Sequence, residues 1–164
     1  IDQDHVSEYC HLYGISICVG HGFGLKEISN QENEARKQRW AFLESSATSF
    51  SCNNIVTAHH QNDNIENFLL QIMRGNHIDS CTMKKNNIVN GFNRFKPFLD
   101  LSKEDIIGSA KYFKVNWNED ETNSDTRYLR NFVRNEIIPK MMEERNVLKT
   151  IPKTIKSLRG NNES

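Results

Sequence analysis

The chain has 164 residues, with 21 basic and 21 acidic side chains. This length is typical of one compact domain with a single core, and it argues against a second independent domain. The balanced total gives no argument for or against a polyanionic partner, but the charge is unevenly distributed. Residues 1–66 hold 4 basic and 9 acidic side chains, residues 67–126 hold 8 of each, and residues 127–164 hold 9 and 4. The C-terminal quarter is therefore the expected face for an anionic ligand.

Cysteine usage and hydropathy argue against several other classes of protein. The four cysteines are far apart, with no CxxC pair and no histidine at zinc spacing: Cys10, Cys18, Cys52 and Cys81. Neither a disulfide framework nor a structural zinc site is indicated. No run approaches the roughly 20 apolar residues of a membrane span, and the first residues lack the order of a signal peptide. We therefore expect a cytoplasmic protein.

The first half of the chain predicts helices that alternate with two short buried strands. Apolar residues recur at helical spacing over residues 4–13 and stop at a glycine. Residues 15–19 and 55–58 are β-rich and predict strands, while residues 30–50 predict a long amphipathic helix. A polar corner and a further helix follow the second strand. This order predicts an α/β fold with a parallel sheet of βαβ units flanked by helices, which binds ligands at the carboxyl ends of its strands.

The second half contains one turn signal and several helical segments. Residues 76–96 predict a hairpin or a strand with a turn, centred on an Asn-Gly pair. A capping-box-like pattern predicts a helix over residues 102–113. Residues 128–142 are helical in pattern until Pro139 interrupts them, and the lysine-rich tail from Pro152 onward is expected to be helical or frayed.

The first of two polar clusters follows the strand predicted at residues 55–58. If the next helix begins near Asn62, Asp63 and Glu66 share one face near its N-terminus. Two carboxylates there could hold Mg²⁺ or a substrate ammonium, or Asp63 could simply favour the helix dipole while Glu66 is solvated. His59 and His60 lie at the strand end, where an imidazole can donate to phosphate, stack on a base or serve a structural role.

The second polar cluster covers residues 119–139. Asn123 and Asp125 fit a turn that caps the following helix. That helix carries three arginines at spacings of three and four residues: Arg127, Arg130 and Arg134. Three guanidiniums on one face suit phosphate, although a solvated helix face is the alternative. Arg36 and Arg39 form a similar but weaker pair.

The order and spacing of these residues closely resemble the tRNA(Ile)-lysidine synthetases. The matching segments are Glu32 to Trp40, Thr57 to Glu66, Arg74-Gly75, Arg94 to Phe98, Glu119 to Asp125, Arg130 to Arg134 and Ile137 to Pro139. These enzymes are ATP pyrophosphatases of the PP-loop superfamily with a Rossmann-like sheet. They activate the C2 carbonyl of the wobble cytidine of a tRNA with ATP, and the side-chain amine of lysine then displaces the adenylate.

The resemblance implies a role for each matching residue. Asp63 and Glu66 would orient the lysine ammonium or a metal ion, with Asp63 as the candidate Mg²⁺ ligand. Arg130 would offset charge on the triphosphate as the adenylate forms. Three residues would bind ATP beside Arg130: Arg36, His59 and His60. Three would contact phosphate or the tRNA backbone: Arg39, Asn131 and Arg134. ATP, Mg²⁺, tRNA and free lysine are therefore the implied ligands.

The sequence departs from the family pattern in three respects. Asn62 replaces the first of two adjacent aspartates, and Asn64 and Asn67 stand where the family has Gln and Thr. The family's first strand and its SGGxDS loop, which grips pyrophosphate, do not occur in this sequence. We therefore expect a catalytic domain over residues 1–144 that is incomplete at its N-terminus, followed by a basic tail over residues 145–164.

Several alternatives follow from the third departure. The chain could be a fragment, or a separate polypeptide could supply the loop. It could also be a non-catalytic RNA-binding relative that uses its basic C-terminal region. A tRNA-thiolating enzyme of the same fold is a further alternative, although such enzymes generally use paired cysteines and Cys52 and Cys81 are not arranged in that way.

Overall fold

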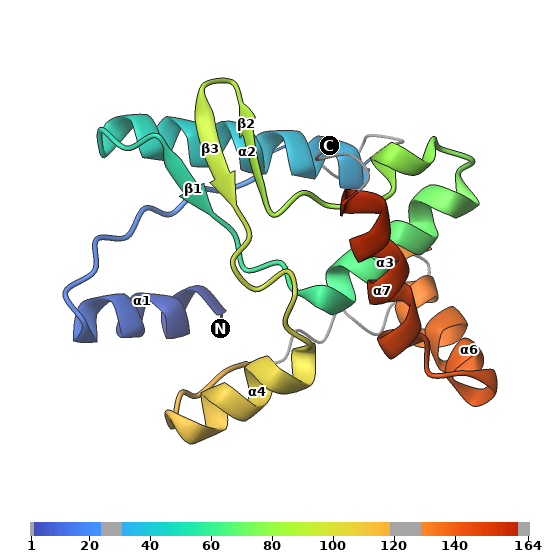
Figure 1. Ribbon diagram of the computed structural model, residues 1–164. Coiled ribbons are helices and arrows are strands. Elements are labelled where there is room, and N and C mark those ends of the chain that lie inside the picture. Colours follow the sequence, from blue (N-terminus) through green and yellow to red (C-terminus); the bar gives the residue numbers. More distant parts are fainter. Residues whose placement is uncertain (1, 24–30, 119–128, 161–164) are drawn as a thin grey trace. The chain divides into compact units, whose positions relative to one another are not determined.

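The computed structural model describes residues 2–23, 31–118 and 129–160 (Figure 1). Its elements in chain order are α1 (Asp2–Leu12), α2 (Gln31–Ser49), β1 (Asn54–Val56), α3 (Gln61–Met73), the 3₁₀ turn η2 (Ile78–Ser80), β2 (Asn86–Val89), β3 (Phe92–Phe95), α4 (Lys103–Tyr112), α5 (Leu129–Phe132), the π-helical turn η4 (Val133–Ile137), α6 (Ile138–Glu144) and α7 (Val147–Gly160). They form two compact units, Ile1–Ile55 with Ile88–Asn93 and Val56–Asn87 with Arg94–Ser164.

The first unit contains the two helices predicted at residues 4–13 and 30–50. Segment 15–23 runs beside α2 within this unit. The side-chain amide of Gln38 accepts a hydrogen bond from the backbone N–H of Phe23 (3.1 Å) and donates one to its carbonyl (3.0 Å). Gly20 approaches the ring of Phe42 so closely that a Cβ would lie 2.7 Å from it. This close approach requires glycine at position 20.

The strand predicted at residues 15–19 is wrong. The segment is extended but joins no ladder, and its apolar side chains Ile15, Ile17 and Val19 are exposed. The sheet formed by the described residues has three strands in the order β1-β3-β2. A β-rich segment becomes a strand only when a neighbour accepts its backbone hydrogen bonds, and this segment pairs with none of these three.

The α/β class is confirmed, and the sheet is mixed rather than wholly parallel. The backbone N–H of Asn93 donates to the carbonyl of Asn53 (2.8 Å), and that of Thr57 donates to the carbonyl of Phe95 (2.9 Å). The partners advance in the same direction, so β1 and β3 are parallel as predicted. Strands β2 and β3 form the predicted hairpin, whose turn residues Asn90 and Gly91 both have positive φ, as tight hairpin turns require.

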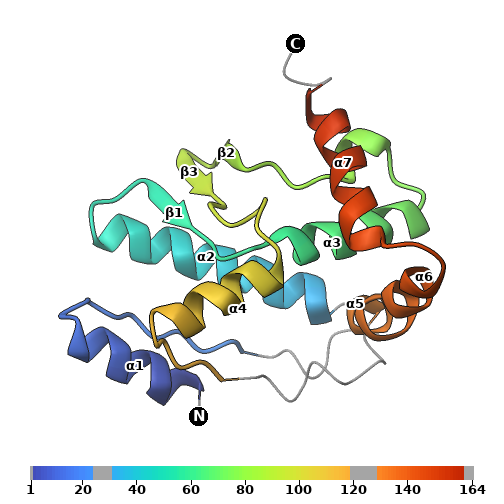
Figure 2. The ribbon, with the colours of Figure 1, turned by 60° about the horizontal axis from the view of Figure 1, so that its bottom comes forward.

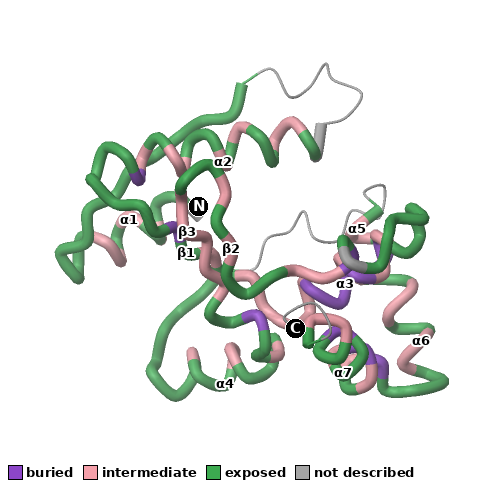
Figure 3. The backbone as a smooth tube through the Cα atoms, turned by 45° about the horizontal axis from the view of Figure 1, so that its top comes forward, coloured by how far each residue is buried: buried purple, intermediate pink, exposed green. Residues whose placement is uncertain are grey.

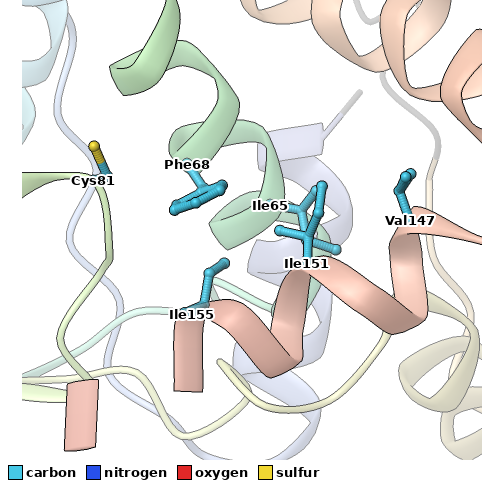
Figure 4. Packing of buried hydrophobic residues seen from close by; sticks show 6 residues of the cluster. All are labelled: Ile65, Phe68, Cys81, Val147, Ile151 and Ile155. Carbon is cyan, nitrogen blue, oxygen red and sulfur yellow. The ribbon is translucent and has the colours of Figure 1, made fainter. Parts of the chain in front are cut away.

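The core of the second unit lies between α3 and α7. Its buried members are Ile65, Phe68, Cys81, Val147, Ile151 and Ile155. Figure 4 shows Ile151 beside Ile65 and Ile155 near Phe68, and Figure 3 shows buried residues along both helices. The spacing of four residues between the buried members of α7 matches one face of a helix.

Two expectations for the C-terminal segments need correction. Helix α7 begins at Val147 rather than at Pro152, which lies inside it. The lost backbone hydrogen bond costs about 3 kcal/mol, and the buried α7 face offsets this cost. Pro139 does not end the preceding helix. The backbone instead widens into the π turn η4 just before it, and this wider turn accommodates the missing N–H of Pro139 in the first turn of α6.

The capping box predicted at the start of α4 is confirmed. The hydroxyl of Ser102 accepts from the backbone N–H of Asp105 (3.1 Å), and the carboxylate of Asp105 accepts from the backbone N–H of Ser102 (3.1 Å). Figure 2 shows α4 from a second direction. Among the described helices, none is long and apolar enough to cross a membrane.

Truncation of the core should destabilise the second unit. Ile65 is 0% exposed, so Ile65→Ala should lower the free energy of unfolding by about 3 kcal/mol through lost burial and the cavity left behind. Ile88 on β2 is 74% exposed, and Ile88→Ala should change it by less than about 0.5 kcal/mol. Urea unfolding followed by circular dichroism measures both. Equal losses for the two variants would contradict this assignment of the core.

Candidate functional site

The N-terminus of α3 holds the first polar cluster. His60 is the N-cap residue, and its backbone N–H donates to Oδ2 of Asp63 (3.0 Å). This bond fixes the first turn of α3, so that Asp63 and Glu66 lie on one face as predicted. A short loop separates this turn from β1, and the cluster therefore lies just beyond the carboxyl end of that strand.

Two arginines from the second polar cluster bind these carboxylates. Nη2 of Arg130 lies 2.9 Å from Oδ1 of Asp63, and Nε of Arg130 lies 2.8 Å from Oε2 of Glu66. Arg134 forms a bidentate pair with Glu66, with Nε 2.7 Å from Oε1 and Nη2 3.0 Å from Oε2. The predicted convergence of Asp63, Glu66 and Arg130 is confirmed. We call these four residues the ion-pair cluster.

The ion-pair cluster is closed, electroneutral and partly buried. The side chain of Glu66 is 3% exposed and that of Asp63 is 17% exposed, while the two arginines are about a third exposed. A carboxylate as buried as Glu66 is unfavourable unless it is paired, and the two guanidiniums pair it. In return, hydrogen bonding to Glu66 raises the pKa of Arg134, more than burial lowers it. The cluster therefore holds two fixed positive charges at one place.

The backbone between α5 and α6 explains how both arginines reach the same carboxylate. Arg130 belongs to α5 and Arg134 to the π-helical turn η4. Val133, between them, is fully buried and anchors the segment. A π turn changes the angular offset between residues four apart, and such turns are frequent at functional sites.

The carboxylates of the ion-pair cluster do not fit Mg²⁺. Each oxygen of Glu66 and Oδ1 of Asp63 already accepts a hydrogen bond from a guanidinium, and Oδ2 of Asp63 accepts one from the backbone of His60. The two arginines already neutralise the two carboxylates, so the cluster has no net negative charge left for a divalent cation. The described residues contain no group of three acidic, histidine or cysteine side chains suited to a metal. The Mg²⁺ expectation for Asp63 thus finds no support in this geometry.

The two histidines differ in their surroundings. Nδ1 of His59 lies 2.9 Å from the hydroxyl of Thr57. Nε2 of His60 lies 3.5 Å from Oδ2 of Asp63, and its buried Nδ1 has no hydrogen-bond partner within the described residues. A buried polar atom without a partner is uncommon and is consistent with a ligand contact. The nucleotide-pocket role of both histidines stays a prediction.

The roles predicted for Arg36, Arg39 and Asn131 are not tested by the structure. Arg36 and Arg39 are exposed on α2, in the first unit, and their phosphate roles stay predictions. Asn131 is half-buried on α5, and its RNA role is likewise untested. Residues 119–128 of the second polar cluster, which include Asn123, Asp125 and Arg127, lie outside the described residues.

The three asparagines that depart from the family pattern bind the backbone of distant segments, a structural role that the sequence did not predict. Oδ1 of Asn62 accepts from the backbone N–H of Lys103 (2.9 Å), and Oδ1 of buried Asn64 accepts from that of Met83 (3.0 Å). The amide of Asn67 donates to the carbonyl of Cys81 (3.0 Å). The side-chain amide of asparagine can pair with a backbone N–H or carbonyl at each of these positions. The sequence around each asparagine does not predict which distant backbone group it binds.

A second charged group lies elsewhere in the second unit. Asp100 accepts hydrogen bonds from Nζ of Lys85 (3.0 Å) and Nη1 of Arg159 (3.2 Å). Burial alone would raise the pKa of Asp100, but the hydrogen bonds and charges of Lys85 and Arg159 lower it overall. This carboxylate thus connects the segment before β2 with the C-terminal turn of α7.

The lowered pKa of Asp100 predicts a small dependence of stability on pH. A carboxyl whose pKa is lower in the folded state stabilises above its ordinary value of 3.8, and this contribution is lost as the pH falls through the folded value. At pH 7, Asp100→Asn should therefore reduce the free energy of unfolding by less than about 1 kcal/mol, because the pair is exposed. Urea midpoints should differ at pH 7 and converge at about pH 2.5. A difference that grows in acid would contradict the assignment.

The chain is similar to known proteins in sequence and in fold. Residues 1–141 match the PP-loop domain family. The tRNA(Ile)-lysidine synthase of Histophilus somni (strain 2336) is 40% identical over 114 residues, which cover 68% of this chain and 26% of that protein. That of Legionella pneumophila (strain Lens) is 29% identical over 143 residues, covering 87% and 32%. The chain thus spans about a quarter to a third of these relatives' length.

A solved structure with the same fold is the U34-tRNA thiolase NcsA from Methanococcus maripaludis with its 4Fe–4S cluster. Its TM-score is 0.75 and its identity 12%, over 99% of this chain and 56% of that one. At this identity the likeness shows the fold alone. The sequence matches confirm the resemblance that the motifs predicted, and this structure confirms the α/β fold.

Proposed function

The chain belongs to the PP-loop domain family, and we propose that it is the catalytic part of an ATP-dependent ligase that joins lysine to C2 of the wobble cytidine of tRNA(Ile). The observation that carries this proposal is the ion-pair cluster. Residues from two distant motifs meet there, with donors and acceptors at 2.7–3.0 Å. Both motifs belong to the segments that resemble the lysidine synthetases.

In the proposed reaction, the C2 carbonyl oxygen of the cytidine attacks the α-phosphorus of ATP and pyrophosphate leaves. The lysine side-chain amine then attacks C2, loses a proton and displaces AMP. Arg130 engages the carboxylates through Nε and Nη2, which leaves Nη1 for phosphate oxygens. A guanidinium held in place before the reaction stabilises developing phosphate charge without reorganisation. Asp63 and Glu66 thus act on phosphate through Arg130.

Lysine binding is the second part of the proposal. Of the cluster's carboxylate oxygens, Oδ2 of Asp63 is the one that no guanidinium binds in the described structure. Its neighbours are the backbone N–H of His60 at 3.0 Å and Nε2 of His60 at 3.5 Å, and Asp63 is more exposed than Glu66. A carboxylate oxygen can accept a further hydrogen bond. We therefore assign the contact with the lysine ammonium to Asp63 rather than to Glu66. Asp63→Asn should raise the KM for lysine more than the KM for ATP.

Cofactor and location follow from the proposed reaction. ATP supplies the adenylate, and Mg²⁺ would accompany its phosphates, since Mg²⁺ commonly binds substrate phosphates in such sites.

All four cysteines are free, which agrees with a reducing, cytoplasmic location. A separate polypeptide carrying an SGGxDS loop remains part of the proposal, and an assay with and without that peptide tests it.

A mass-spectrometric assay for a lysine adduct on cytidine tests the proposed function. The chain is incubated with ATP, Mg²⁺, lysine and tRNA(Ile), with and without the SGGxDS peptide. We expect an adduct and release of AMP and pyrophosphate. Salt-dependent tRNA binding without an adduct in either assay, unchanged by Asp63→Ala, would instead favour a non-catalytic RNA-binding protein. Sulfur incorporation that cysteine alkylation abolishes would favour a thiolating enzyme.

A further inference from the structure

Helix α7 carries its positive charge opposite the side that it buries. Val147, Ile151 and Ile155 pack against α3 (Figure 4). At about 100° per residue, the three lysines of the helix fall within roughly 60° of one another on the other side. They are Lys149, Lys153 and Lys156, all exposed. We call these three residues the α7 basic face.

The charge pattern of α7 differs from that of an ordinary solvated helix. Its sequence, VLKTIPKTIKSLRG, contains no acidic residue. Within the part of the chain that the structure describes, none of the three lysines forms an ion pair. Solvated helix faces usually interleave both signs, as α2 does with Glu34, Arg36 and Lys37. An unbalanced row of like charges on a packed helix is the electrostatic pattern of a polyanion-binding surface.

The positive surface continues beyond the C-terminal end of this row. Arg159 lies three residues after Lys156, and its Nη1 shares Asp100 with Nζ of Lys85. Nε and Nη2 of Arg159 are buried and have no hydrogen-bond partner among the described residues. These two nitrogens are screened from solvent, so Arg159 contributes positive charge at this end of α7 rather than an accessible donor. Asp100 partly neutralises this end.

We propose that the α7 basic face, extended by Arg159 and Lys85, binds the phosphate backbone of an RNA. The identity of that RNA as tRNA rests on the proposed function, but the surface itself does not. The three lysines extend over about 10 Å of the helix axis, so flexible lysine side chains can reach several phosphates of one strand. A membrane is a poorer partner, because the apolar side of α7 is buried in the core and cannot insert.

A matched pair of triple variants tests this surface. Lys149→Gln/Lys153→Gln/Lys156→Gln removes three charges with little change in helix propensity. Lys103→Gln/Lys111→Gln/Lys114→Gln removes three exposed charges at α4 and serves as the control. Binding of fluorescent tRNA is measured as a function of salt. We expect the first variant to bind about tenfold more weakly near physiological salt, with a salt slope lower by about 2, and the control to stay within about twofold.

Asp100→Asn should change binding in the opposite direction. It removes the carboxylate that Lys85 and Arg159 share, so tRNA affinity should rise about two- to threefold. Circular dichroism of every variant verifies that α7 is folded. Equal weakening in both triple variants would overturn the proposal, since it would show an effect of net charge alone. Tighter binding to phosphatidylserine vesicles than to tRNA, lost in the α7 variant, would overturn it in favour of a membrane surface.

The same experiment separates this inference from the proposed function. If no lysine adduct forms but tRNA binding depends on the α7 basic face, the surface is supported and the ligase proposal fails. In the other case the adduct forms, and the α7 variant changes neither the KM for tRNA in adduct formation nor the affinity for tRNA. The ligase proposal is then supported and this inference fails.

Discussion

Glu66→Gln is expected to lower lysidine formation at least about 100-fold and the free energy of unfolding by about 2 kcal/mol. Glu66 accepts bonds from Nε of Arg130 and from Nε and Nη2 of Arg134, and it is 3% exposed. A glutamine has the same shape but a single acceptor oxygen, and its NH₂ group would face a guanidinium donor. The stability loss is smaller than for a fully buried pair because both arginines reach solvent.

A double-mutant cycle shows whether the effect comes from pairing. Arg134→Gln alone should also destabilise, whereas Glu66→Gln with Arg134→Gln should cost less than the sum of the two single changes. Glu143→Gln on the exposed side of α6 is the matched control and should change neither stability nor product. Additive losses would contradict a direct Glu66–Arg134 interaction. A Glu66→Gln variant with normal product formation would remove the ion-pair cluster from the mechanism.

Local rules explain why much of the candidate site could be predicted from the sequence. The start of α3 follows from the strand before it and from the helical spacing after it, which together place Asp63 and Glu66 on one face. Arg130 and Arg134 are four residues apart, which predicts one side of a helix, although the π turn η4 that adjusts their offset has no signal in the sequence. Two carboxylates and two guanidiniums with these spacings are complementary, so their convergence needed only that the two segments pack together.

The features that could not be predicted depend on distant partners. Residues 15–19 have strand composition, yet whether they form a strand depends on a neighbour that composition does not reveal. The saturation of Glu66 by two arginines is a property of packing between α3 and the α5–η4 segment. Pro152 suggested the start of a helix, but burial of Val147 and Ile151 against α3 decides where α7 begins.

Arg130→Lys should retain the positive charge and still reduce lysidine formation by about 10²- to 10³-fold. Arg130 contacts both carboxylates, through Nε to Glu66 and Nη2 to Asp63, and this fork fixes the direction of Nη1. A lysine ammonium has three donors on one compact nitrogen, without the planar fork that holds two carboxylates and directs a third nitrogen at phosphate. The loss should therefore appear mainly in kcat, because the stabilisation is needed as the adenylate forms.

Single-turnover kinetics with ATP and lysine varied separately measure this distribution. Arg145→Lys, an exposed arginine at the end of α6, is the control and should behave as the unchanged chain does. tRNA affinity should stay within about twofold in both variants, since the α7 basic face is intact. A rise in the KM for lysine with an unchanged kcat would show that Arg130 only holds Asp63 in place. A loss confined to kcat would place the guanidinium on the phosphate that ATP transfers to the cytidine.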